Sequence, residues 1–94
     1  MIDNTARIET MRNRLQAAFS PKSLEIIDDS HKHAGHAGAK TGMGHFTVSI
    51  VSDRFSGTNL LQRHRMVYEA LGEMMETDIH ALSISAYTPE ELKP

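Results

Sequence analysis

The chain has 94 residues, of which 39% are hydrophobic and 23% charged, so it can bury one modest core but not two. Its formal net charge of −2 disfavours a general nucleic-acid-binding surface, and its lack of cysteine excludes disulfides and thiolate ligands of its own. No segment is apolar for long enough to span a membrane, and the N-terminus lacks a signal-peptide pattern. We therefore expect one domain over 1–94, and the lack of cysteine fits a cytoplasmic location.

The first predicted elements are a helix over 5–19 and a strand over 23–29. Apolar residues recur at helical spacing in the first segment: Ile8, Met11, Leu15, Ala18 and Phe19. One of residues 3–5 can cap this helix, and Ser20-Pro21 ends it because a residue before proline avoids the helical conformation. SLEIIDD, residues 23–29, alternates apolar and polar residues and predicts a short strand.

A loop rich in glycine and histidine follows over 30–44. It holds four of the chain's six glycines and three of its six histidines, which are His31, His33 and His36. Long loops in small domains are usually functional or disordered. Neutral imidazole is a good ligand for iron, copper and zinc, so this loop is a candidate metal site, the alternative being solvated loop histidines.

The rest of the chain predicts strand, helix, strand and helix. HFTVSIVS (45–52) alternates and predicts a strand with one buried face. Asn59 and Gln62 form a capping-box pattern that starts a helix running to about 76, with Gly72 inside it for a packing reason. The apolar stripe of this helix is Leu60, His64, Val67, Leu71, Met74 and Met75.

IHALSISAY (79–87) predicts the third strand, and TPEE (88–91) is a strong start signal for a short last helix. The helical crossover makes the second and third strands parallel, and we expect the first two to pair antiparallel across the loop. The expected fold class is α+β. No phosphate-binding loop and no nucleophile paired with a base is visible, so we expect no enzyme activity.

Four motifs resemble the BolA family: DDSHKHAGHAG (28–38), HFTVSIVSDRFSG (45–57), LQRHRMVYEAL (61–71) and IHALSISAYTPEE (79–91). They stand in the family's order and spacing and cover nearly everything after the first helix. Leu92 departs from the pattern, because many members have tryptophan there. The resemblance implies a KH type II-like fold, α-β-β-α-β-α, with a three-stranded mixed sheet and its helices packed on one face.

The resemblance also implies work with a monothiol glutaredoxin and glutathione, in iron–sulfur cluster trafficking and iron homeostasis. A two-iron two-sulfur cluster would be shared between the two proteins, with none expected in the isolated chain. The ligand near the start of the last strand is here His80. The second ligand comes from the glycine-rich loop and is His33, with His36 as its alternative and His31 ranked third.

Spacing alone gives other interpretations of the histidines outside the loop. His80 shares strand parity with Leu82 and Ile84, which predicts a hydrogen-bonded histidine at the rim of the core. His45 is interpreted as structural, with a hydrogen bond to loop backbone. His64 is interpreted as a core histidine that bonds a backbone carbonyl.

A second role that the resemblance implies is DNA binding, with transcriptional control of morphology and stress response. Arg54, Arg63 and Arg65, with Lys32 on the loop, can contact phosphates, the alternative being an ordinary solvated surface. A KH domain clamps the backbone with a GxxG loop, but the matching turn at 55–59 has one glycine. The expected partners are therefore a glutaredoxin and, as the alternative, DNA; a weak homodimer stays open, and no membrane contact is expected.

Overall fold

The computed structural model describes residues 4–30 and 43–93. Its elements in chain order are α1 (Thr5–Phe19), β1 (Ser23–Asp28), β2 (Gly44–Val51), the 3-10 turn η2 (Asp53–Phe55), α3 (Leu60–Leu71), α4 (Met74–Thr77), β3 (Ile79–Tyr87) and the 3-10 turn η3 (Pro89–Leu92). The sheet order is β1-β2-β3, with β1 antiparallel and β3 parallel to β2. The predicted α+β class and mixed sheet are confirmed.

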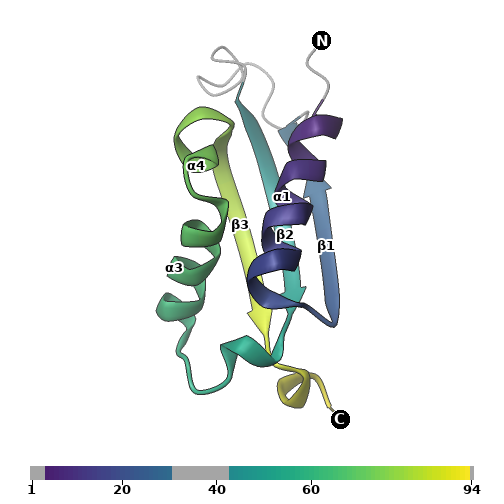
Figure 1. Cartoon of the computed structure of the whole chain (residues 1–94), viewed down its shortest axis with the longest axis vertical. Coiled ribbons are helices and arrows are strands. Elements are labelled where there is room, and N and C mark those ends of the chain that lie inside the picture. Colours follow the sequence, from purple (N-terminus) through teal and green to yellow (C-terminus); the bar gives the residue numbers. More distant parts are fainter. Residues whose placement is uncertain (1–3, 31–42, 94) are drawn as a thin grey trace.

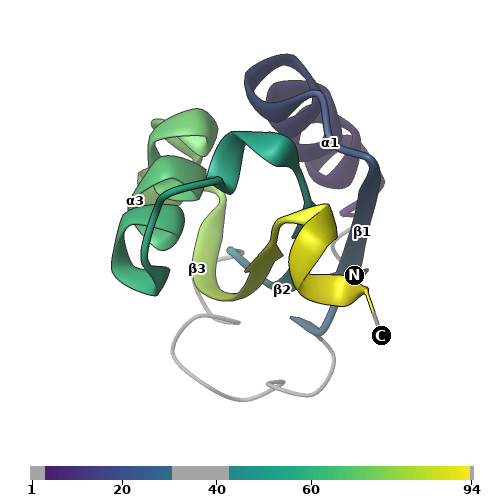
Figure 2. The ribbon, with the colours of Figure 1, turned by 90° about the horizontal axis from the view of Figure 1, so that it is seen from below.

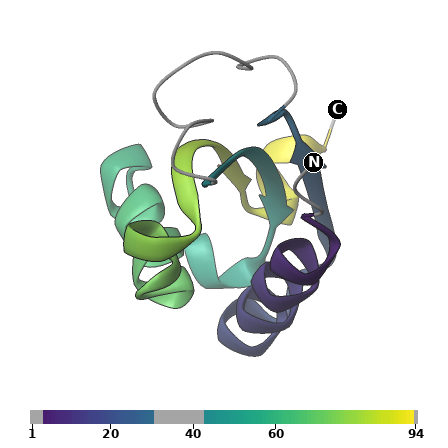
Figure 3. The same cartoon turned by 90° about the horizontal axis from the view of Figure 1, so that it is seen from above.

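Both long helices cover the same face of the sheet, α1 over β1 and β2 and α3 beside β3 (Figure 1). The end-on views show this layering from below and from above (Figures 2 and 3). Buried apolar side chains from both layers fill the space between them: Met11, Leu15, Phe19, Phe46, Val48, Ile50, Phe55, Val67, Leu71, Met74, Ile79 and Ala86. Strand alternation sets this core, because every second residue of β2 from Phe46 to Ile50 points into it.

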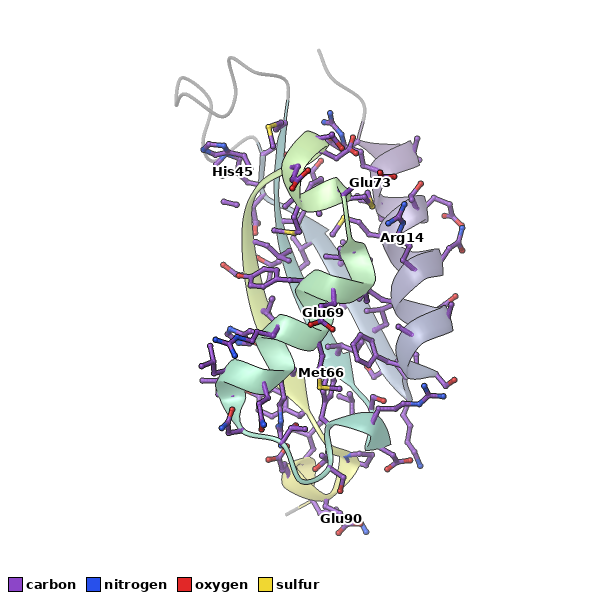
Figure 4. All side chains as sticks on the ribbon, turned by 60° about the vertical axis from the view of Figure 1, so that its left-hand side comes forward. Arg14, His45, Met66, Glu69, Glu73 and Glu90 are labelled. Carbon is purple, nitrogen blue, oxygen red and sulfur yellow. The ribbon has the colours of Figure 1, made fainter. Side chains whose placement is uncertain are left out.

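The helix predicted to run from 60 to about 76 is two helices. Gly72 ends α3 with φ 57° and ψ −130°, a backbone conformation that residues other than glycine rarely adopt. Arg14 of α1 supports this end, because its Nη1 donates to the Leu71 carbonyl at 2.8 Å and its Nη2 lies 3.7 Å from Glu73 Oε1. Figure 4 shows Arg14 and Glu73 facing each other between α1 and α4. The break thus comes from the backbone conformation of Gly72, and packing also favours glycine there, because a Cβ would stand 3.1 Å from Arg14 Nη1.

The capping patterns of the sequence form as predicted. Asn59 and Gln62 exchange side-chain and backbone hydrogen bonds at the start of α3. Thr88 and Glu91 exchange the same kind of hydrogen bonds at the start of η3, but η3 is a single 3-10 turn and not an α-helix. Within 4–30 and 43–93, none of the helices has the length and apolarity needed to cross a bilayer.

Candidate functional site

His80 occupies a β-bulge at the start of β3. Gly44 pairs with Ile79 and the next residue, His45, pairs with Ala81, so the register skips His80. Ile79 is 1% exposed in the core, whereas His80 and Ala81 are both exposed. The prediction from strand parity, which placed His80 at the rim of the core, is therefore wrong. The extra residue of a bulge reverses the alternation, and bulges commonly re-aim a side chain beside functional sites.

His45 lies beside His80 and is held by its backbone. Its N–H donates to Ser30 Oγ at 3.0 Å, and its carbonyl accepts from the Asp29 N–H at 2.8 Å. The residue is 6% exposed, and its ring centroid lies 5.1 Å from that of His80. Figure 4 shows His45 at the end of the sheet where β2 begins, on the side away from α1. These contacts fit the structural role expected for it.

The loop residues expected to complete the site lie outside the described residues. His31, Lys32, His33 and His36 all belong to 31–42. The described segments end close to His80: Ser30 bonds the backbone of His45, and the Gly44 N–H donates to the Asp78 carbonyl at 2.9 Å. The described residues on the two sides of the loop therefore make hydrogen bonds close to the two histidines: Ser30 to His45 itself, and Gly44 to Asp78, two residues before His80.

No complete metal site exists within residues 4–30 and 43–93. These residues contain no group of three or more histidines or carboxylates that could hold a metal ion. His80 therefore offers one exposed nitrogen ligand, and a metal bound there needs its other ligands from elsewhere. The chain has no cysteine, so any thiolate ligand of such a metal would come from outside it.

Arg63 is an internal residue, which places it outside a phosphate-binding surface. Its Nη1 and Nη2 donate to Glu91 at 2.6 and 3.1 Å, and Nη1 also donates to the Ala86 carbonyl at 3.0 Å. Its side chain is 10% exposed, and the guanidinium carbon lies 5.9 Å from the centroid of the Phe55 ring. The Arg63 guanidinium and the Thr88 N–H lower the pKa of Glu91 to about 2.

The inward stripe of α3 keeps Val67 and Leu71 of the predicted one, but Arg63 is buried in place of Leu60 and His64. Arg63, Val67 and Leu71 are buried, while Leu60 is 64% exposed and His64 is only half-buried. The Nε2 of His64 is buried without a hydrogen-bond partner among the described residues, so the expected bond from this atom to a carbonyl is absent there. Arg63 takes the inward position because Glu91, far along the chain, neutralises its charge there.

Two predicted phosphate contacts remain on the surface. Arg54 is exposed on η2, although its Nη1 donates to the Ala18 carbonyl at 2.9 Å. Arg65 is exposed on α3. Gly57, in the turn between them, has φ 76°, and no atom of the described residues lies within 4 Å of the point where a Cβ would stand, so this turn is open to solvent.

Comparison with known proteins gives four findings. A family model described as BolA-like protein matches residues 15–91. The chain is 45% identical over 83 residues to the Escherichia coli (strain K12) protein named DNA-binding transcriptional regulator BolA, covering 88% of this chain and 76% of that protein. It is 49% identical over 88 residues to Protein BOLA1, chloroplastic, of Arabidopsis thaliana, covering 90% of this chain but 55% of that longer protein. The solved BolA domain of SufE1 from Arabidopsis thaliana is similar with a TM-score of 0.84 and 41% identity, covering 93% and 96% of the two chains.

Proposed function

Because the chain belongs to the BolA-like protein family, we propose that it is a non-enzymatic adaptor that binds a monothiol glutaredoxin and shares a two-iron two-sulfur cluster with it. Such an adaptor would act in iron–sulfur cluster trafficking and iron homeostasis. The observation that carries the proposal is His80, an exposed imidazole at a bulge, while residues 4–30 and 43–93 hold no complete metal site.

In this proposal His80 supplies one nitrogen ligand, and His33 or His36 supplies the second. The glutaredoxin and glutathione supply the thiolates that this chain lacks. Replacing thiolate by imidazole raises the reduction potential of a cluster, so the histidines would tune how firmly the partner's cluster is held. The bulge contributes by keeping the His80 ring outside the core, where a partner protein can reach it.

The test is anaerobic cluster reconstitution with a monothiol glutaredoxin and glutathione, followed by visible absorption and circular dichroism. We expect a spectrum that differs from that of the glutaredoxin alone and that is lost with His80→Ala. Ser83→Ala, an exposed position on the same strand, is the matched control and should keep the spectrum. A mixture in which wild type leaves the glutaredoxin spectrum unchanged and forms no complex would reject the proposal. Variants His33→Ala and His36→Ala then rank the loop ligands.

DNA binding is the second candidate function, and the name of the Escherichia coli relative is the finding that favours it. Arg54, Arg65 and Lys32 are the phosphate contacts retained for it, because Arg63 is engaged internally. The net charge of −2 argues for a local contact and not a broad basic surface. Fluorescence anisotropy with duplex DNA tests it: affinity should fall steeply with salt, and the salt slope should be smaller for Arg65→Gln. Binding equal for wild type and Arg54→Gln/Arg65→Gln would exclude this surface.

A further inference from the structure

The start of α1 contributes a buried polar residue whose side chain does not cap the helix. Asn4 stands at the N-cap position, is 7% exposed and makes no capping hydrogen bond. Its Nδ2 instead donates to Asp28 Oδ2 at 3.0 Å and Ser30 Oγ at 3.1 Å, and its Oδ1 accepts from Arg7 Nη1 at 2.9 Å. Asparagine is a favourable N-cap residue, but here its side chain makes tertiary hydrogen bonds instead. Two of these bonds reach Asp28 and Ser30 at the end of β1.

Ser30 carries this contact on to β2. Its Oγ accepts from Asn4 and also from the His45 N–H at 3.0 Å, while its own N–H donates to Asp28 Oδ1 at 2.9 Å. The His45 ring lies against the ring of His80, with centroids 5.1 Å apart. One line of contacts therefore runs from the first turn of α1 to one side of the proposed ligand.

Arg7 makes a second line of contacts on the other side. Its Nε donates to Asp78 Oδ1 at 3.0 Å, and the Asp78 carbonyl accepts from the Gly44 N–H at 2.9 Å. Asp78 is two residues before His80, and Gly44 is the last residue paired before the bulge. The side chain of Arg7 is 21% exposed and that of Asp78 34%, so this ion pair is partly shielded from solvent.

We propose that Asn4 and Arg7 are positioning residues that hold the His80 imidazole in its outward orientation, Asn4 through Ser30 and His45 and Arg7 through Asp78. Both residues precede 15–91, the part of the chain that the family model matches. A fixed ring orientation matters for a ligand, because a shared cluster tolerates only small errors in the position of each donor atom. The part concerning a cluster rests on the proposed function, while the positioning itself does not.

The isolated protein provides the first test, because each contact line ends at an amide that reports on it. The His45 N–H reports the Ser30 line and the Gly44 N–H reports the Asp78 line. We expect Asn4→Ala to speed hydrogen exchange of the His45 amide by about tenfold, and Arg7→Gln to do the same for the Gly44 amide. The Ser52 N–H, bonded to the Tyr87 carbonyl at the opposite end of the sheet, should stay within about twofold.

Further variants keep this test decisive. Arg12→Gln and Asn13→Ala alter polar residues further along the same helix, beyond its first two turns, so both should leave exchange at His45 and Gly44 unchanged. Ser30→Ala breaks the first line from its other end and replaces Asn4→Ala if that variant does not fold. The nuclear Overhauser effect between the His45 and His80 rings should weaken in the Asn4, Arg7 and Ser30 variants. Unchanged exchange and an unchanged effect between the rings would overturn the positioning role, whatever the glutaredoxin does.

The second test uses the reconstituted complex. Asn4→Ala and Arg7→Gln should shorten the lifetime of the His80-dependent dichroism signal about tenfold under a chelator. Arg12→Gln and Asn13→Ala, further along the same helix, should leave this lifetime within about twofold of wild type. An equal loss of lifetime in all four variants would overturn the positioning role and indicate general destabilisation, and an unchanged lifetime in the Asn4 and Arg7 variants would overturn it as well. If wild type gives no His80-dependent signal, the proposed function fails, and the exchange experiment alone decides the positioning role.

Discussion

Replacing Gly44 with alanine should destabilise the protein by about 3 kcal/mol, because the start of β2 has no room for a methyl group. A Cβ at Gly44 would lie 2.5 Å from both Cε2 and Cζ of Phe46, and 3.2 Å from Ser30 Oγ. Since carbon atoms pack best at about 3.5 Å, the overlap with the ring is about 1 Å. Phe46 is 2% exposed in the core, so its ring cannot move outward to relieve the overlap.

The expected loss of stability lies at the upper end of the range for overpacked cores, because either the backbone or the core side chains must shift to make room for the methyl group. For a domain of this size, about 3 kcal/mol lowers the melting temperature by about 12–24 °C. The two ring atoms that cause the clash suggest a rescue. Phe46→Leu removes them, so the double variant Gly44→Ala/Phe46→Leu should be more stable than the sum of the two single effects predicts, by at least about 1 kcal/mol.

Urea unfolding followed by far-ultraviolet circular dichroism measures these differences, with an unchanged m-value as the check on two-state behaviour. Gly57→Ala is the matched control, since Gly57 has φ 76° but no described atom within 4 Å of its Cβ position. It should cost about 1–2 kcal/mol through backbone conformation alone and show no coupling to Phe46→Leu. A loss below about 1 kcal/mol for Gly44→Ala, or additive behaviour with Phe46→Leu, would refute the close-packing argument.

Two further predictions concern the proposed ligand and the internal ion pair. His80→Cys should keep a shared cluster, unlike His80→Ala, and lower its reduction potential because thiolate replaces imidazole; loss of the cluster in both variants would contradict a ligand role for this position. The pKa of Glu91 falls from an ordinary 4.5 to about 2, mainly through the hydrogen bond from Arg63, so its contribution to stability is complete above pH 4.5 and is lost as the pH falls towards 2. The gap between the unfolding midpoints of wild type and Glu91→Gln should therefore be constant near neutral pH and close between pH 4.5 and 2, and a gap that persists at pH 2 would disprove this coupling.

Local patterns predicted most elements of the fold. Helical spacing from Ile8 to Phe19 marked the buried side of α1, and alternation marked the inner face of β2. The capping boxes at Asn59 and Thr88 formed where they were expected. These features depend on residues within a few positions of each other, and a linear pattern contains all of that information.

The prediction of the site was less complete, because its geometry depends on distant parts of the chain. The outward turn of His80 comes from how β3 pairs with β2, and strand parity assumes a ladder without a bulge. The inward turn of Arg63 depends on Glu91, a charge that apolar periodicity does not consider. Asn4 is a residue type that commonly caps helices, and only the folded chain brings Asp28 and Ser30 next to it.

The sequence by itself determined the α+β class, the order of the elements and the family, because hydrophobic periodicity, caps and motif spacing are properties of neighbouring residues. The tertiary structure decided which polar side chains turn inward and which turn outward. That choice depends on whether a partner for each charge or amide arrives from another element, as Glu91 does for Arg63 and Ser30 for Asn4. Burying a polar group is favourable only where a hydrogen-bonding or charged partner is in place, and the position of that partner depends on the fold.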